Sequence, residues 1–154
     1  MMEISYRWTD GKDPVFHKFY LKTEEYYSSI VGGRQNRLAF VPYNVSDNIS
    51  HVLIARCGEA DAGCAGLKAY SDDDVEIKRV WVEPEYRGNH IAISMMNILE
   101  EKAKGLGFKR VILQTRPQMT DAVGLYTRLG YTLIDNYPPY DKLEGAVCYA
   151  KDIG

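Results

Sequence analysis

Cysteine is scarce in this sequence, and the few cysteines form no recognisable pattern. The 154 residues contain three of them, Cys57, Cys64 and Cys148, an odd number without CxxC spacing. Neither a disulfide framework nor a zinc knuckle is therefore supported. We predict that the three thiols behave as small, buried hydrophobic groups.

Long apolar runs and blocks of one charge are also missing. No apolar segment approaches the roughly 18 residues that a membrane-spanning helix needs, and the first residues, MMEISYRWTDGKD, lack the charged-then-apolar order of a signal peptide. The chain carries 19 Lys and Arg against 21 Asp and Glu, and it has no basic block that would indicate nucleic acid as a principal ligand. We therefore expect a cytoplasmic protein with a small-molecule partner, and neither nucleic acid nor a membrane as ligand.

Two phosphate-binding motifs and the usual hydrolase and metal patterns are absent too. No GxxxxGK[ST] or GxGxxG occurs, so a kinase, P-loop or Rossmann interpretation is unsupported. The three histidines, His17, His51 and His90, suggest neither a Ser-His-Asp order nor a metal cluster. We expect no metal site.

What the chain does contain is an alternation of helical and extended patterns, without a linker or an internal repeat. Its length and its 45% hydrophobic content fit one domain over residues 1–154. The predicted order is β, α, β, β, β, α, β, α, β, β, a mixed α/β domain with an antiparallel meander in its first half. The expected strands cover 3–8, 50–57, 62–70, 74–82, 109–115, 131–137 and 146–153, with a further extended segment at 37–44.

Three helices complete this prediction, and their ends carry capping signals. The first runs from an N-cap at Asp13 and a first-turn Pro14 to the glycines at 32–33. The second follows Pro84 and stops near residues 105–107. The third has Thr120 or Asp121 as its cap and a glycine at 130 as its stop.

The stretch EYRGNHIAISMMNIL, residues 85–99, leads from a turn into the second helix. A helix N-terminus exposes unpaired N–H groups and carries a partial positive charge, so a glycine-assisted turn before it can hold a phosphate or pyrophosphate. Arg87 adds a planar, permanently charged guanidinium. The alternative is that Gly88 only lets the strand turn into the helix.

The surrounding sequence favours the phosphate interpretation. The segment VEIKRVWVEPEYRGNHIAISMMNILEEKAKGLGFKRVILQT, followed by AVGLYTRLGYTLI, resembles the GNAT superfamily of acyl-CoA-dependent N-acetyltransferases. In that family an [RQ]xxGx[GA] loop holds the pyrophosphate of coenzyme A. The resemblance places this loop on Arg87, Gly88, Asn89, His90, Ile91 and Ala92.

One position departs from the family pattern. His90 stands where the family has its central glycine, so a side chain is present where the backbone normally approaches the cofactor closely. Either this side chain points outward, or it donates a hydrogen bond to a phosphate, or it weakens binding.

The first half and the C-terminal end of the chain extend the resemblance. The segments LAFVPYN, GCAGLKAY and NYPPYDKLEGAVCYAKDI are similar to a bacterial subgroup of small amino-acid or amine acetyltransferases. The resemblance implies a mixed, mostly antiparallel central sheet that is flanked by helices and splayed at an acetyl-CoA site. It also implies direct transfer of an acetyl group from acetyl-CoA to a small primary amine, without a covalent enzyme intermediate.

The resemblance also suggests roles for individual residues. Tyr126 would be the general acid beside the coenzyme A sulfur, which suits a phenol of pKa about 10, and the alternative is that it packs in the core. Glu76 would be the base, through ordered water, through a pKa raised by burial or by attracting the amine, and the alternative is a surface carboxylate paired with Lys78. The backbone of Val80, Trp81 and Val82 would pair with the pantetheine arm and stabilise the oxyanion.

The acceptor site is the least defined part of this prediction. Candidate lining residues are Tyr43, Asn44, Tyr137 and Tyr140, which are equally typical of loop anchors. Arg79 could bind a substrate carboxylate, or it could form a structural ion pair. Two other functions stay open: acetylation of protein N-termini or lysines, and a degenerate domain that binds acyl-CoA without turnover. A homodimer through edge strands is a further hypothesis.

Overall fold

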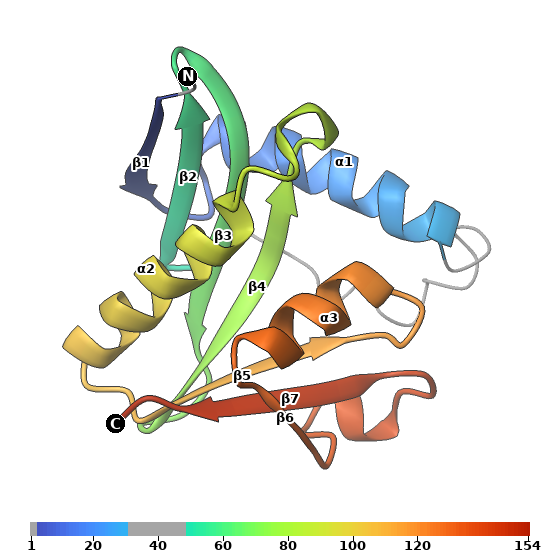
Figure 1. The fold of residues 1–154 in the computed structure, drawn as a ribbon. Coiled ribbons are helices and arrows are strands. Elements are labelled where there is room, and N and C mark those ends of the chain that lie inside the picture. Colours follow the sequence, from blue (N-terminus) through green and yellow to red (C-terminus); the bar gives the residue numbers. More distant parts are fainter. Residues whose placement is uncertain (1–2, 31–48) are drawn as a thin grey trace.

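The computed structural model describes residues 3–30 and 49–154 as a mixed α/β domain (Figure 1). The strands are β1 (Ile4–Thr9), β2 (His51–Cys57), β3 (Ala60–Ala69), β4 (Asp74–Val82), β5 (Arg110–Thr115), β6 (Thr132–Ile134) and β7 (Val147–Asp152). The helices are α1 (Pro14–Ile30), α2 (Ile91–Gly105) and α3 (Thr120–Arg128), with short 3-10 turns η3 (Pro84–Tyr86) and η4 (Tyr140–Lys142). This order of helices and strands is the predicted one. The extended segment expected at 37–44 lies outside the described residues.

The seven strands form one sheet in the order β1-β2-β3-β4-β5-β7-β6. All neighbouring pairs are antiparallel except β4 and β5, which are parallel. The parallel pairing joins Asp74–Glu76 to Arg110–Ile112 and then ends, although both strands continue. Figure 1 shows β4 and β5 spreading apart beyond this point. The predicted fold class, a mostly antiparallel sheet that opens in its middle, is confirmed.

The two faces of the sheet carry different helices. Along β2, Leu53 and Ala55 belong to the main core with α2, while Val52 and Ile54 pack with Phe16 of α1. Because successive side chains of a strand point to opposite faces, α1 and α2 cover opposite sides of the sheet. The three cysteines are free and buried, as predicted.

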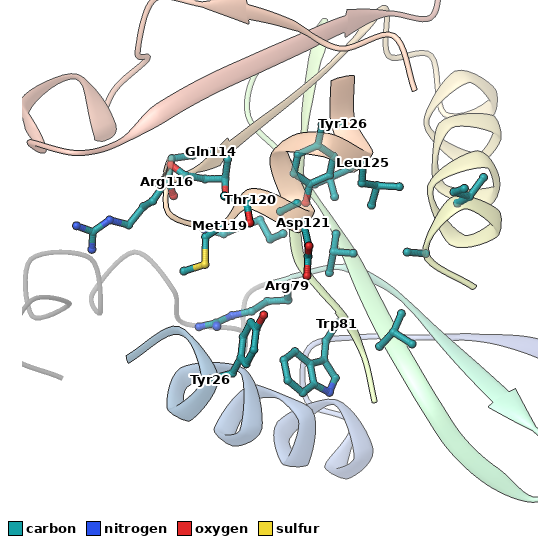
Figure 2. Close-up of a pocket in the computed structure, with 18 of the residues that line it drawn as sticks. Tyr26, Arg79, Trp81, Gln114, Arg116, Met119, Thr120, Asp121, Leu125 and Tyr126 are labelled. Carbon is teal, nitrogen blue, oxygen red and sulfur yellow. Dashed lines mark hydrogen bonds between the residues drawn. The ribbon is translucent and has the colours of Figure 1, made fainter. Parts of the chain in front are cut away.

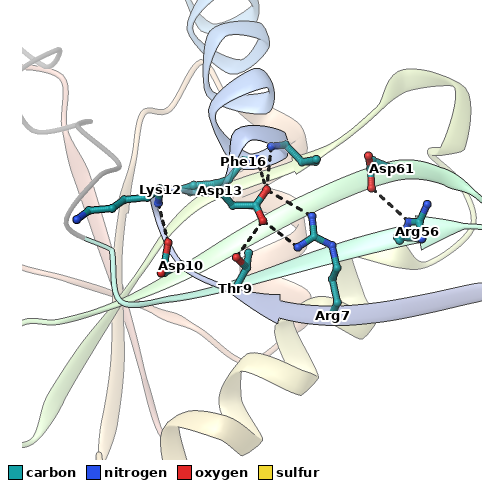
Figure 3. A network of polar contacts seen from close by, with 9 residues as sticks. Arg7, Thr9, Asp10, Lys12, Asp13, Phe16, Arg56 and Asp61 are labelled. Atoms are coloured by element: carbon teal, nitrogen blue, oxygen red, sulfur yellow. Dashed lines mark hydrogen bonds and ion pairs between the residues drawn. The ribbon is translucent and has the colours of Figure 1, made fainter.

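The start of α1 follows its capping signal. Asp13 accepts a hydrogen bond from the N–H of Val15 at 2.8 Å through Oδ1, and its Oδ2 accepts one from Arg7 at 2.9 Å. Figure 3 shows this carboxylate at the centre of a polar network that ties β1 to the first turn of the helix. The predicted cap at Asp13 is confirmed.

Two expected boundaries were wrong, one at α3 and one at β6. The N-cap of α3 is Met119, which makes no side-chain capping bond, so Thr120 and Asp121 are the first helical residues instead. By contrast, the second helix begins at residue 91 after the 3-10 turn of residues 84–86, which agrees with the predicted turn before this helix. The expected strand 131–137 is shorter, since Asn136 turns toward the following loop and donates to the carbonyl of Ala146 at 2.8 Å.

Among the described residues, none of the helices has the length and apolar character needed to cross a membrane. The same part of the chain holds no group of three or more His, Cys, Asp and Glu side chains that could bind a metal ion.

Candidate active site

A cavity of about 770 Å³ lies where β4 and β5 diverge. Its walls are the second half of β4, the end of β5, the start of α3 and the N-terminal turn of α2, and Tyr26 of α1 lies opposite α3 (Figure 2). The volume is in the range of ~300–1,000 Å³ that is typical of small-molecule sites.

Most of the site residues predicted from the sequence meet in this cavity. Its lining includes Glu76, Arg79, Val80, Trp81, Val82, Arg87, Gly88, His90, Ala92, Tyr126 and Tyr140. Three further candidates, Asn89, Ile91 and Tyr137, are not among the lining residues. Tyr43 and Asn44 lie outside the described residues.

The turn before α2 has the backbone geometry of a glycine-rich loop. Gly88 and His90 both adopt left-handed backbone conformations, with φ of 86° and 62°. The first intrahelical hydrogen bond of the turn runs from the N–H of Ser94 to the carbonyl of His90, so the preceding N–H groups have no partner within the helix. The side chain of Ile91 is buried in the core, and its approach to a ligand would be through its backbone.

Side chains of the loop brace this turn from outside. Arg87 donates from Nε to the carbonyl of Val82 at 2.9 Å, and its guanidinium lies over the rings of Trp81 and Tyr26. Asn89 donates from Nδ2 to the carbonyl of Tyr86 at 2.9 Å. Asn89 therefore stabilises the turn, and Arg87 is held beside the N-terminus of α2.

The strand β4 carries a β-bulge in the wall of the cavity. Trp81 pairs with Cys64 and Lys78 pairs with Gly66, so Arg79 and Val80 together face a single residue of β3. Arg79 adopts φ of 63°, a left-handed conformation that costs a non-glycine residue about 1–2 kcal/mol. The bulge therefore lies in the segment whose backbone was predicted to contact the cofactor.

The backbone beyond the bulge divides between β3 and the cavity. The N–H of Glu83 bonds to the carbonyl of Ala62, at the β3 side. Backbone groups of alternate residues point to opposite sides of a strand, so those of Val82 and Val80 point toward the opening with β5. The side chain of Trp81 is buried toward α1, where its Nε1 donates to Glu83 at 3.0 Å.

Tyr126 lies on the inner side of α3. Its ring is buried in the main core beside Tyr131, with ring centroids 5.9 Å apart, and its hydroxyl points into the cavity (Figure 2). The position of the hydroxyl suits the predicted general acid. The ring of the same residue packs in the core, as the alternative prediction had it.

Glu76 is buried. The alternative prediction for this residue, a carboxylate on the surface of the protein, is therefore wrong. Its Oε2 accepts a hydrogen bond from Tyr137 at 2.7 Å, and the Nζ of Lys78 lies 3.7 Å from Oε1. Tyr137 thus holds Glu76 instead of lining the cavity. The pairing with Lys78 that the sequence suggested is present, but in the interior.

Burial and the charge of Glu76 set the protonation of its neighbours. Burial lowers the pKa of Lys78 from its ordinary value, although the Glu76 carboxylate opposes this shift. Burial also raises the pKa of Tyr137 and of Tyr140, and the negative charge of Glu76 adds to both shifts. Both phenols therefore keep their protons at neutral pH and can donate hydrogen bonds.

Arg79 forms the structural ion pair that was one of its two predicted roles. Its Nη1 lies 2.9 Å from Oε1 of Glu24, and its guanidinium stacks over the ring of Tyr20 at 4.2 Å. Because its side chain also borders the cavity, contact with a substrate stays a prediction.

Sequence reasoning missed several lining residues. Gln114 lies near the end of β5 and Arg116 directly after it, while Met119 is the N-cap of α3 and Thr120 and Asp121 are its first residues. Their position at the C-terminal end of a strand next to a helix start was the available signal, since ligands often bind there in open α/β sheets. Tyr26 of α1 carried no such signal.

A model of a known protein family matches most of the chain. The model is described as the acetyltransferase (GNAT) family, and it covers residues 8–131. The chain belongs to the GNAT acetyltransferase family. This confirms the family that the sequence resembled.

Individual relatives and solved structures agree with this membership. The uncharacterized N-acetyltransferase YjgM of Escherichia coli K12 is 33% identical over 73 residues, which are 47% of this chain and 44% of that protein. The chain spans about half the length of the curated relatives it matches.

Two solved structures have the same fold as this GNAT domain. A Klebsiella pneumoniae protein assigned as an acyl-CoA N-acyltransferase superposes with a TM-score of 0.78 at 22% identity, over 100% of this chain and 99% of that one. The PaiA N-acetyltransferase of Thermoplasma acidophilum, solved in complex with coenzyme A, superposes with a TM-score of 0.75 at 16% identity, over 98% and 99%. At these identities the likeness concerns the fold.

Proposed function

We propose that this GNAT domain binds acetyl-CoA and transfers the acetyl group to the primary amine of a small molecule, such as an amino acid. The observation that carries the proposal is the cavity between β4 and β5, in which the α2 turn, the bulged β4 backbone, Glu76 and Tyr126 meet. These groups come from distant parts of the chain, and each has a use in acyl transfer to an amine.

The residues around the α2 turn fit the pyrophosphate of coenzyme A. The helix dipole and the N–H groups that have no partner within α2 favour an anion there, and Arg87 adds a positive charge. A Cβ added at Gly88 would meet no atom within 4 Å, so the turn is open on the side of the glycine. Arg87, Gly88 and the backbone of 90–92 would hold the diphosphate.

When bound, acetyl-CoA would supply an activated acetyl thioester. Backbone N–H groups of β4 that face the opening would stabilise the carbonyl oxygen as negative charge develops on it. Tyr126 would donate its hydroxyl proton toward the departing sulfur. Glu76 would draw the amine in and accept its proton, either directly or through water.

The composition of the lining supports direct attack by the amine. No described residue that borders the cavity is a serine or a cysteine, and the three buried cysteines all lie elsewhere. Serine and cysteine are two of the side chains that carry acyl groups in covalent mechanisms, and neither borders the described part of the cavity.

A calorimetric titration with acetyl-CoA tests the proposal first, with coenzyme A and ATP as comparisons. We expect saturable binding of acetyl-CoA and coenzyme A that ATP does not share. Turnover is then measured as thiol release with free amino acids, polyamines and short peptides as acceptors. Release with peptides alone would favour a protein acetyltransferase, and binding without release with any acceptor would favour a domain that only senses acyl-CoA. No binding at millimolar acetyl-CoA would overturn the proposal.

A further inference from the structure

The bulged half of β4 is held by α1 as well as by the sheet. On its β3 side this segment has strand partners, while β5 has already separated from it at Glu76. Two ion pairs reach it from α1, one at each end of the segment 79–83. Helix α1 therefore contacts a segment of β4 that pairs with only one neighbouring strand in the described sheet.

The first of these contacts is at the bulge itself. Arg79 has the positive φ of the bulge, and its carbonyl accepts a hydrogen bond from the thiol of Cys64 at 3.4 Å. Its side chain is only 4% exposed, pairs with Glu24 at 2.9 Å and stacks on Tyr20. A left-handed backbone at a non-glycine residue persists only where its surroundings hold it, and these contacts do so.

The second contact is at the end of the strand. Lys22 donates to both carboxylate oxygens of Glu83, at 3.0 and 2.9 Å, and Trp81 donates to Oε1 of the same group. Burial alone would raise the pKa of Glu83, but these hydrogen bonds outweigh it, and the pKa is lowered. Glu83 therefore stays ionised and bonded to α1 at neutral pH.

We propose that Glu24 and Arg79 are positioning residues, whose ion pair fixes the bulge so that the backbone of Val80 and Val82 faces the cavity. The effect of this ion pair on the reaction rate rests on the proposed function, whereas its effect on the backbone of β4 is independent of it. On this view Arg79 acts through the backbone that it holds. It does not bind the acceptor.

Two substitutions at one position separate these roles. Glycine adopts positive φ without strain, whereas alanine does not. We expect Arg79→Ala and Glu24→Gln to lower kcat about tenfold or more, because a small displacement of groups at the reacting carbonyl is costly. Arg79→Gly also loses the ion pair but adopts positive φ without strain, so it should lower kcat less than Arg79→Ala does, and acceptor KM should change less than about twofold in all three. Glu25→Gln, an exposed neighbour on α1, is the matched control and should change neither constant.

A second measurement needs no activity and no ligand. Amide hydrogen exchange followed by mass spectrometry reports how firmly residues 79–83 are held. We expect peptides that contain this segment to exchange at least about threefold faster in Glu24→Gln than in Glu25→Gln. The native protein and the control should exchange alike.

The outcomes separate failure of this inference from failure of the proposed function. An Arg79→Gly variant as slow as Arg79→Ala, with a raised acceptor KM, would overturn the positioning role and make Arg79 an acceptor ligand. Equal exchange in Glu24→Gln and Glu25→Gln would overturn it as well. A native protein that fails to bind acetyl-CoA would remove the proposed function, and the exchange result would still decide whether α1 fixes the bulge.

Discussion

His90 combines a glycine-like backbone with a side chain at the rim of the cavity. Its φ of 62° places it in the left-handed region, where glycine has no steric cost and histidine is one of the better tolerated residues. The imidazole is exposed and makes no capping bond to α2. The backbone at this position thus has a positive φ that glycine adopts without strain, although the residue is histidine.

Replacing His90 by glycine should therefore leave the turn intact. We expect acetyl-CoA to bind His90→Gly equally or more tightly, and the free energy of unfolding to stay within about 1 kcal/mol, because relieved strain offsets the added freedom of the unfolded chain. Calorimetric titration and thermal denaturation measure both quantities. A loss of affinity of tenfold or more would instead make the imidazole a phosphate ligand.

Tyr126 allows a similarly local test. Tyr126→Phe removes only the hydroxyl that points into the cavity, so we expect turnover to fall about 100-fold or more with little change in acetyl-CoA affinity. Tyr131→Phe is a matched control, because it removes a hydroxyl from the other ring of the same pair. That hydroxyl donates to Glu100 and does not border the cavity. Unchanged turnover in Tyr126→Phe would remove the general-acid role.

Among the elements, α1 lies outside the predicted cofactor motif, yet it lines the cavity with Tyr26 and forms an ion pair with the bulge of β4. The helix is fixed at its start by Asp13 and reaches the β4 segment through Lys22 and Glu24 further along. The hydrogen bond from the Arg7 guanidinium lowers the pKa of Asp13 to about 2, and bonds from Thr9 and from the N–H of Val15 act in the same direction. The cap therefore stays ionised well into acid.

The effect of this cap on stability depends on pH. We expect Asp13→Ala to lower the free energy of unfolding by about 1–2 kcal/mol at neutral pH. The folded pKa lies below the unfolded value near 3.8, so the stabilisation is fully present above about pH 4 and is lost as the pH falls through 2. Denaturant unfolding of the native and variant proteins between pH 7 and pH 2 should show the two curves converging in that window.

A nearby carboxylate provides the control for this experiment. Asp10 accepts one hydrogen bond from the N–H of Lys12 and does not cap the helix (Figure 3). The change in the free energy of unfolding should be less than about half as large for Asp10→Ala as for Asp13→Ala. A gap between native protein and Asp13→Ala that stays constant down to pH 2 would contradict the ionised cap.

At the scale of the whole molecule, the cavity lies in a seam of the sheet. β4 and β5 are joined by three paired residues on each strand, and the two halves of the sheet separate beyond them. Side chains of α3 line one wall of the opening, and side chains of β4 and α1 line the other. A ligand held between these walls would link both halves.

Acetyl-CoA should therefore raise the melting temperature of the protein. At 100 times the dissociation constant, a ligand that binds only the folded state adds about 2.7 kcal/mol, which corresponds to roughly 5–10 °C for a domain of this size. Thermal denaturation at several acetyl-CoA concentrations measures the shift, with ATP as the control ligand. Saturable binding in calorimetry without any thermal shift would mean that the unfolded chain binds acetyl-CoA as well, and would contradict a site that only the folded sheet forms.

Local sequence signals determined the order of the elements and the turn before α2. Alternating and helical hydrophobic periods depend only on neighbours along the chain, and so do a cap such as Asp13 and the glycine at 88. The resemblance to GNAT proteins added the family and the fold class. The end of β6 was missed where a contact across the loop is present, since Asn136, which was expected in the strand, donates to the carbonyl of Ala146.

Tertiary structure alone decided how the site is assembled. Nothing near Glu76 in the sequence indicates that Tyr137, 61 residues away, donates to it, or that Lys22 reaches Glu83. The bulge at Arg79 is likewise invisible in the sequence, since it depends on the register with β3 and on the ion pair with α1. Such contacts form between residues that only the packed sheet brings together, and periodicity along one segment carries no information about its partners across the fold.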